Sequence, residues 1–214
     1  MNIVVIDYGS GNLRSVAKAI ERAAATGDGD ADIQVTGDAD LLRRADRIVL
    51  PGVGAFGDCL AGLNGLPGMG DALTEAVLRQ ARPFLGICVG MQLLAAHSVE
   101  HGRHDGLGWI GGEVTPLDPV DKTLKIPHMG WNELSIVADQ HPVLAGISTG
   151  SHAYFVHSFA FRCVSDDAMM ASVEYGGRMT AMVGRDNIVG TQFHPEKSQE
   201  TGLRLLRNFL RWRP

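Results

Sequence analysis

Several features that mark common protein classes are scarce in this sequence. Only three of its 214 residues are cysteines, Cys59, Cys88 and Cys163, and they are widely spaced with no CxxC pair. Such an odd, scattered set excludes a disulfide framework. No apolar run approaches the roughly 20 residues of a membrane helix. The segment MNIVVIDYGSGN has neither a basic region nor a small-residue cleavage site, so we expect no signal peptide and a cytoplasmic protein with reduced thiols.

An excess of charge of one sign is also missing. Nineteen Lys and Arg residues face 24 Asp and Glu residues, for a net charge of −5. This balance gives no electrostatic reason to expect nucleic acid or an anionic membrane as a partner. The 45% of hydrophobic and 20% of charged residues are typical of a globular protein. Because no linker or repeat divides the chain, we expect a single domain over residues 1–214.

The pattern of apolar residues changes along the chain. Up to about Gly106, β-branched runs alternate with segments of helical periodicity, which predicts a parallel sheet covered by helices on both faces. Beyond it, strand-like runs follow one another, and a hairpin turn is expected at GRDN (184–187). The expected fold is an α/β three-layer sandwich with a mainly parallel central sheet and an antiparallel extension. Strands are expected at 2–7, 31–35, 46–52, 82–87, 111–117, 131–137, 152–162, 169–175 and, as a hairpin, 178–194; helices are expected at 9–23, 41–45, 70–81, 90–99 and 198–212.

The strongest chemical signal lies in the segment PFLGICVGMQLL. Its Cys88 stands between two glycines where a strand gives way to a helix, which is the G-x-C-x-G form of a nucleophile elbow. Glycines suit a turn whose backbone is sharp and strained. The start of the following helix favours a thiolate, and the N–H of Val89 can donate to an oxyanion. A buried structural cysteine is the alternative, and we keep that interpretation for Cys59 and Cys163.

A thiol nucleophile needs a base, and the segment VGTQFHPEKS supplies one. His194 stands at the end of a predicted strand, and Glu196 follows it across a proline that stiffens the backbone. The carboxylate could then orient the imidazole, as in a nucleophile–base–acid triad. Alone, H-P-E reads equally as a strand-end turn. Together with the cysteine elbow, it indicates a Cys-His-Glu triad.

These segments resemble those of the class-I, triad-type glutamine amidotransferases. GICVGMQLL is similar to the family's nucleophile segment, GTQFHPEKS to its base segment and LPGVGAFGD to its oxyanion loop. The resemblance implies that Cys88 attacks the side-chain amide of glutamine, with His194 as base and acid and Glu196 orienting His194. It also implies that the N–H of Val89 and a peptide N–H of the Gly52–Val53 loop hold the oxyanion. In this family the loop is expected to rearrange, on a signal from a partner, before it becomes productive.

The same resemblance implies the residues that bind glutamine. Gln92 lies one helical turn after Cys88, on the same face. Glu100 would meet the α-amino group of the substrate, although a surface acid is an equal alternative. Ser158 and Phe159 would present backbone groups. No cofactor or metal is implied.

Three further segments, IDYGSGNLRSV, IPHMGWNEL and YFVHSF, resemble one branch of the family. In this branch the glutaminase is a subunit that passes ammonia to a separate cyclase subunit, which forms an imidazole product in histidine biosynthesis. The chain is thus expected to form a heterodimer with a cyclase. An exposed aromatic side chain suits an interface anchor, whereas core packing is the alternative for Trp131. The expected partner face comprises Asn12, Trp131, Asn132, Tyr154 and Lys197.

Other motifs are weaker. DYGSGNLR follows a strand and opens a helix, but Arg14 stands where a dinucleotide-binding fingerprint has its third glycine. DGDAD (28–32) resembles the start of a calcium loop, yet Ile33 and Ala39 occupy the positions of its glycine and glutamate, so we expect a solvated turn there. A surface cluster, and not a metal site, is expected for the histidines His97, His101 and His104.

Two alternative functions remain at this stage. The first keeps the glutaminase chemistry but changes the ammonia acceptor, for example to vitamin B6 or purine synthesis. The second is a non-enzymatic thiol sensor or chaperone on a similar elbow, which would need Cys88 but leave the His194–Glu196 pair without a role.

Overall fold

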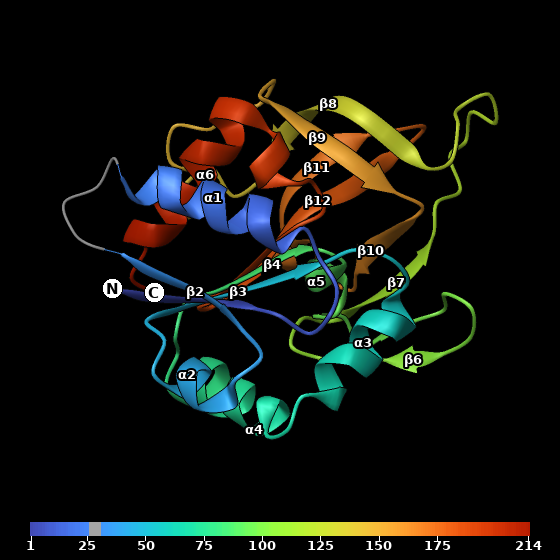
Figure 1. Ribbon diagram of the computed structural model, residues 1–214. Helices are drawn as coiled ribbons and strands as arrows, with labels where there is room; N and C mark the ends of the chain where they lie inside the picture. The colour runs from blue at the N-terminus through green and yellow to red at the C-terminus, as the bar shows by residue number, and fades with distance from the viewer. Residues whose placement is uncertain (26–30) are drawn as a thin grey trace.

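The protein is described by a computed structural model, in which a nine-stranded mixed sheet forms the central layer. Figure 1 shows this sheet between its covering helices. The structure describes residues 1–25 and 31–214. In spatial order the strands are β2 (Asp32–Thr36), β1 (Asn2–Ile6), β3 (Arg47–Gly52), β4 (Phe84–Cys88), β13 (Ile188–Thr191), β12 (Arg178–Arg185), β11 (Met169–Glu174), β8 (His128–Ile136) and β9 (His152–His157). Neighbours pair in parallel from β2 to β13 and antiparallel from β13 to β9.

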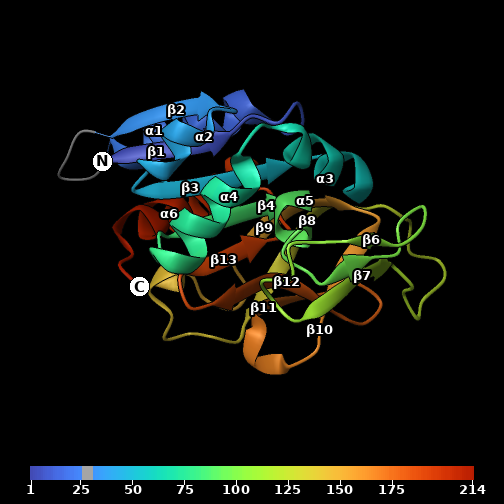
Figure 2. The same ribbon diagram turned by 90° about the horizontal axis from the view of Figure 1, so that it is seen from below.

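Helices cover both faces of the parallel half, so the expected three-layer α/β class is confirmed. The helices α1 (Leu13–Ala24) and α6 (Gln199–Arg211) pack together on one face in Figure 1. On the other face, seen from below in Figure 2, lie α2 (Ala39–Arg43), α3 (Phe56–Gly65) and α4 (Met69–Leu73), and a π-helical stretch at Thr74–Arg79 continues α4. Strands β3 and β4 are buried along their whole length, as expected for apolar runs covered on both sides.

The predicted helical faces are largely the buried ones. In α1, Val16, Ala17 and Ile20 face the core, as the helical periodicity predicted. In α6, Leu206 and Leu210 are buried whereas Leu203 is half-buried; Leu205 and Phe209 complete the apolar face. The predicted GRDN hairpin is also confirmed. Its turn lies between the paired residues Arg185 and Ile188, and Asp186 adopts a left-handed φ of 51°.

The helix expected at 90–99 is wrong beyond its first turn. Helix α5 (Val89–Gln92) is only four residues long, and the chain then turns back into the short strand β5 (His97–Ser98). The carbonyl groups of Leu93, Ala95 and Ala96 accept hydrogen bonds from residues 106–108 instead of continuing a helix. Tertiary hydrogen bonding therefore overrides a good local helical pattern.

The strand expected at 152–162 is two strands in different sheets. It breaks at Ser158 into β9 and β10 (Phe159–Cys163). Strand β10 belongs to a second sheet of order β10-β7-β5-β6, with β7 at Gly112–Pro116 and β6 at His104–Asp105. The break places Ser158 at the junction of the two sheets, beside the candidate site.

Helix α3 was not expected, because its sequence FGDCLAGLNG holds three glycines that lower helix propensity. It forms because Phe56, Cys59 and Leu63 bury one face. The solvated turn expected at 28–32 falls mostly on residues 26–30, outside the described ones. Within residues 1–25 and 31–214, no helix is both long and apolar enough to cross a membrane, and no three His, Cys, Asp or Glu residues gather as metal ligands.

Candidate active site

Cys88 occupies a strained turn at the end of β4. Its backbone has a φ of 56° and a ψ of −113°, a conformation that a non-glycine residue rarely adopts. The flanking glycines are required by close contacts, as predicted. A Cβ added to Gly86 would lie 2.5 Å from the carbonyl oxygen of Gly90, and one added to Gly90 would lie 1.8 Å from that of Leu50. Because α5 has a single turn, the helix dipole that acts on Cys88 is weaker than that of the predicted longer helix.

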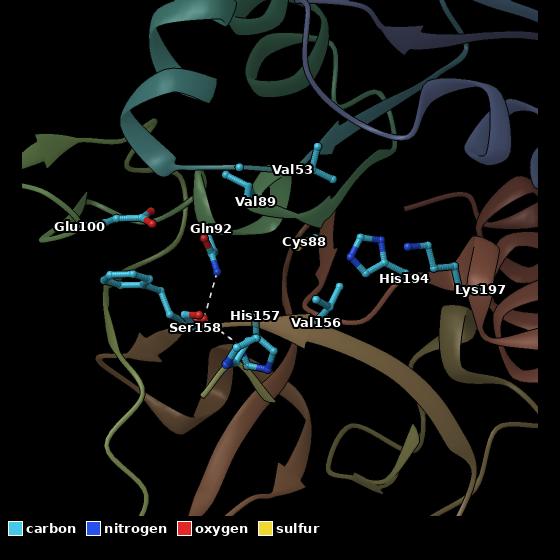
Figure 3. Close-up of a pocket in the computed structure, with 13 residues that line it drawn as sticks. Val53, Cys88, Val89, Gln92, Glu100, Val156, His157, Ser158, His194 and Lys197 are labelled. Carbon is cyan, nitrogen blue, oxygen red and sulfur yellow. Dashed lines mark hydrogen bonds between the residues drawn. The ribbon is translucent and has the colours of Figure 1, made fainter. Parts of the chain in front are cut away.

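His194 and Glu196 form a buried pair at the end of β13. Nδ1 of His194 lies 2.9 Å from Oε1 of Glu196, and both side chains are almost fully buried. Ser198 holds the turn by donating its hydroxyl to the carbonyl of His194 at 2.7 Å. The Nδ1 contact leaves Nε2 of His194 free of hydrogen-bond partners among the described residues, on the pocket side where Figure 3 shows the ring beside Cys88.

The electrostatics of this pair favour an imidazolium. Burial opposes the charged ring, but the contacts with Cys88 and Glu196 outweigh it and raise the pKa of His194 to about 9. A ring held in this way is suited to exchange a proton with a reacting group beside Cys88. The three predicted triad members therefore lie together, with the base already oriented by the carboxylate.

One predicted oxyanion donor lies at the start of a helix, and the other already has a hydrogen-bond partner. The N–H of Val89 lies in the first turn of α5, where a helix has no partner of its own for it. The N–H of Val53 instead donates to Oγ of Ser10 at 3.3 Å, and the Val53 carbonyl accepts from the same hydroxyl at 2.6 Å. Cys59 donates to that carbonyl as well, at 3.3 Å. The hydroxyl of Ser10 thus bonds both backbone groups of Val53, and the N–H of Val53 is occupied by this contact.

A pocket of about 320 Å³ lies in front of the thiol. All four predicted glutamine contacts line it, but most of their polar groups already have partners. Glu100 accepts from the N–H of Phe56 at 2.8 Å through one carboxylate oxygen. The carbonyl of Ser158 accepts from Leu117, and that of Phe159 accepts from two side chains. For Ser158 and Phe159, the predicted backbone contact with glutamine is therefore restricted to their N–H groups.

Part of the predicted partner face is a compact surface cluster at the edge of this pocket. Trp131 is 46% exposed, which is inconsistent with core packing, and its ring meets that of Tyr154 edge-on at 5.9 Å. Nζ of Lys197 lies 5.6 Å from the centre of the Tyr154 ring. Asn132 is half-buried and bonded to the carbonyl of Glu174. Asn12 starts α1 and directly follows the loop that carries Ser10.

The structure also places residues at the site that the sequence interpretation had not selected. Gln192 is fully buried and its Nε2 lies 3.7 Å from Sγ of Cys88. His157 lines the pocket and bonds to His128, which lies behind it. The strand predicted to end at His194 would have placed Gln192 on the face of His194, because residues two apart on a strand share a face, although β13 itself ends at Thr191.

Comparisons with known proteins agree with this geometry. The family model of class-I glutamine amidotransferases matches residues 4–212. Imidazole glycerol phosphate synthase subunit HisH of Rhodospirillum rubrum is 63% identical over 214 residues, with 100% of both chains covered. The subunit of the same name from Agrobacterium fabrum is 56% identical over 217 residues, again with 100% of both covered. The chain belongs to the HisH family of class-I glutamine amidotransferases.

Solved structures show the same amidotransferase fold at low sequence identity. A crystal structure named as a glutamine amidotransferase aligns with a TM-score of 0.71 and 19% identity, over 97% of each chain. A glutamine amidotransferase from Thermotoga maritima aligns with a TM-score of 0.66 and 17% identity, over 98% of this chain and 96% of that one. The fold is therefore shared with these amidotransferases although most residues differ.

Proposed function

We propose that this chain is the glutaminase subunit of an imidazole glycerol phosphate synthase and acts as one amidotransferase domain over residues 1–214. It hydrolyses glutamine to glutamate and ammonia, and the ammonia passes to a cyclase subunit that forms imidazole glycerol phosphate and aminoimidazole carboxamide ribotide. The observation that carries the proposal is the Cys88 elbow facing an oriented His194–Glu196 pair across the pocket, in a chain 63% identical to a HisH subunit. We expect the complex in the cytoplasm, where histidine is made.

The reaction follows from the three side chains. The Cys88 thiolate attacks the amide carbon of glutamine, and the carbonyl oxygen becomes an oxyanion that the N–H of Val89 stabilises. His194 gives its proton to the leaving nitrogen, the C–N bond breaks, and ammonia departs from a thioester. The neutral ring then takes a proton from water, which hydrolyses the thioester to glutamate and restores the thiolate. Glu196 keeps Nε2 of His194 directed at the reacting atoms throughout.

The decisive experiment is glutamate release from glutamine by the purified chain, alone and with the cyclase subunit and its nucleotide ligand. We expect slow release by the chain alone and strong activation in the complex, because the Val53 N–H is bonded to Ser10 in the free chain. Glutamate release that is fast for the chain alone and unchanged by the cyclase would support the glutaminase activity but refute the cyclase as its partner. No release under either condition would overturn the proposed reaction.

Removing the hydroxyl of Ser10 is predicted to increase the activity of the free chain. The Ser10→Ala variant loses both hydrogen bonds to the backbone of Val53, whose N–H is then freer to turn towards the oxyanion. We expect glutamate release without the cyclase to rise by roughly five- to tenfold, as about one net hydrogen bond is worth. Ser15→Ala, at an exposed site on α1, is the matched control. Unchanged or lower basal release in Ser10→Ala would show that Ser10 does not restrain the loop.

Trp131 is predicted to anchor the cyclase. Truncation of an exposed aromatic anchor commonly costs about 2 kcal/mol of binding free energy, or roughly a thirtyfold rise in Kd. We therefore expect Trp131→Ala to weaken the complex to this extent, measured by titration calorimetry with the purified cyclase. The control is Val164→Ala, whose valine is 85% exposed and lies just after β10. Equal affinities of the two variants would place the interface elsewhere.

A further inference from the structure

A backbone carbonyl below the pocket determines the orientation of the polar side chains around it. The oxygen of Phe159 accepts from Nε2 of Gln92 at 3.1 Å and from Nδ1 of His157 at 2.8 Å. Because a carbonyl oxygen accepts and never donates, both side chains must turn an N–H towards it. The Phe159 carbonyl thus fixes which end of the Gln92 amide points inward and which nitrogen of His157 carries the proton.

The fixed amide of Gln92 in turn orients Gln192. The second hydrogen on Nε2 of Gln92 points at Oε1 of Gln192, 3.0 Å away. With its oxygen committed there, Gln192 directs its own Nε2 to the other side, where Sγ of Cys88 lies at 3.7 Å. Gln192 has no exposed surface, so no water competes for either end of the amide. An N–H donor is therefore aimed at the nucleophile by a chain that starts at the Phe159 carbonyl.

The same series of hydrogen bonds determines which polar atom of Gln92 faces a substrate in the pocket. Both hydrogens of the Gln92 amide are used within the protein, so its oxygen is the polar atom left on that side chain. Gln92 lines the pocket. It consequently presents an acceptor, which is complementary to an ammonium or amide N–H of glutamine and unsuited to a carboxylate.

A second histidine, His128, extends this series of hydrogen bonds beyond His157. Nε2 of His157 is left to accept, and Nδ1 of His128 lies 3.0 Å from it. Nε2 of His128 then accepts from Nδ2 of Asn132 at 3.2 Å. Burial lowers the pKa of both histidines to about 4, so each ring stays neutral near pH 7 and keeps one donor and one acceptor nitrogen. All of these hydrogen bonds are mutually consistent in direction.

We propose that Gln192 is a positioning residue of the glutaminase: its amide N–H holds the sulfur of Cys88, and its amide oxygen fixes Gln92 with an acceptor facing glutamine. The inference rests on the proposed function and deepens it. In this proposal the single buried amide of Gln192 positions both the nucleophile, Cys88, and the substrate contact, Gln92. It also explains a fully buried glutamine on β13's end, where an apolar residue would pack without needing partners.

The test compares Gln192→Met with Gln92→Met, which remove different hydrogen bonds of this series. Methionine has a similar length and volume but donates no hydrogen bond. In Gln192→Met we expect alkylation of Cys88 by iodoacetamide at pH 7, followed on its peptide by mass spectrometry, to slow about tenfold, and kcat to fall at least as far. Gln92→Met leaves the N–H groups of Gln192 in place but removes the partner of its amide oxygen, so we expect alkylation to slow by only about threefold while the KM for glutamine rises about tenfold.

The control is Thr180→Val, a buried polar residue on β12 whose hydroxyl lies 3.9 Å from Sγ of Cys163 and which is not among the residues that line the pocket. It should change none of the three quantities. Alkylation of Cys88 at the normal rate in Gln192→Met would overturn the proposal. Alkylation does not require turnover, so a chain that hydrolyses no glutamine would refute the proposed function while the thiol measurement still tested the role of Gln192.

Discussion

Replacing Cys88 with alanine is expected to abolish glutamine hydrolysis and leave the fold intact. In the proposed reaction the thiol of Cys88 is the group that forms the covalent bond to glutamine. Loss of a nucleophile of this kind lowers kcat by about 10⁴-fold or more. The side chain is small, 5% exposed and already in a left-handed backbone conformation, so alanine adds no clash. Glutamate release by the complex with the cyclase is the measurement, with circular dichroism to confirm folding.

The same variant should change the titration of His194. In the unmodified chain, contacts with Cys88 and Glu196 raise the pKa of the ring to about 9 against the opposing effect of burial. A raised histidine pKa contributes stability that is fully present below about 6.5 and is lost as the pH rises through 9. In Cys88→Ala the part due to the sulfur disappears, so the pKa of His194 should fall and the window of pH-dependent stability should narrow. NMR titration of the ring measures this directly.

Cys163→Ala is the matched control for both measurements. Cys163 is half-buried on β10 and contacts Thr180, away from the triad. It should leave glutamate release and the His194 titration unchanged. A Cys88→Ala protein that still released glutamate would refute the triad, and an unchanged His194 pKa would show that the sulfur and the ring do not interact.

The parts of the site that the sequence predicted are those encoded within a few residues. The elbow follows from two glycines beside one cysteine, and the His194–Glu196 pair from a spacing of two across a proline. Buried runs such as β3 and β4 were equally readable, because a strand covered on both faces is apolar throughout. In these cases the local pattern and the tertiary structure demand the same residues.

The parts that the sequence could not predict depend on contacts between distant segments. Ser10 reaches Val53 across 43 residues, and Gln192 reaches Cys88 across 104. Every residue carries a backbone carbonyl, so a side chain that bonds to one has no partner residue type that the sequence could reveal. The helix expected at 90–99 failed for a related reason, since hydrogen bonds from residues 106–108 capture the carbonyls that would have continued it.

Replacing Gly90 with alanine is expected to damage the site and the fold together. A Cβ at this position would lie 1.8 Å from the carbonyl oxygen of Leu50 and 2.8 Å from its carbonyl carbon, both in the backbone of the buried strand β3. No side-chain rotation relieves such a contact, so α5 must move away from the sheet and carry Cys88 and Val89 with it. We expect a loss of about 3 kcal/mol or more in the free energy of unfolding, since overpacking against rigid backbone lies at the upper end of such effects.

The effect of Gly90→Ala on catalysis should exceed its effect on binding. A displacement of about 1 Å at the nucleophile costs on the order of 100-fold in rate, so kcat should fall at least this far even in the fraction that folds. Gly70→Ala is the control, because a Cβ there meets no atom within 4 Å and the residue lies in helix α4. Alanine should be neutral or stabilise it by up to about 1 kcal/mol. Denaturant unfolding and glutamate release separate the two outcomes, and a Gly90→Ala variant as stable and active as Gly70→Ala would mean that the elbow is not packed against Leu50 in solution.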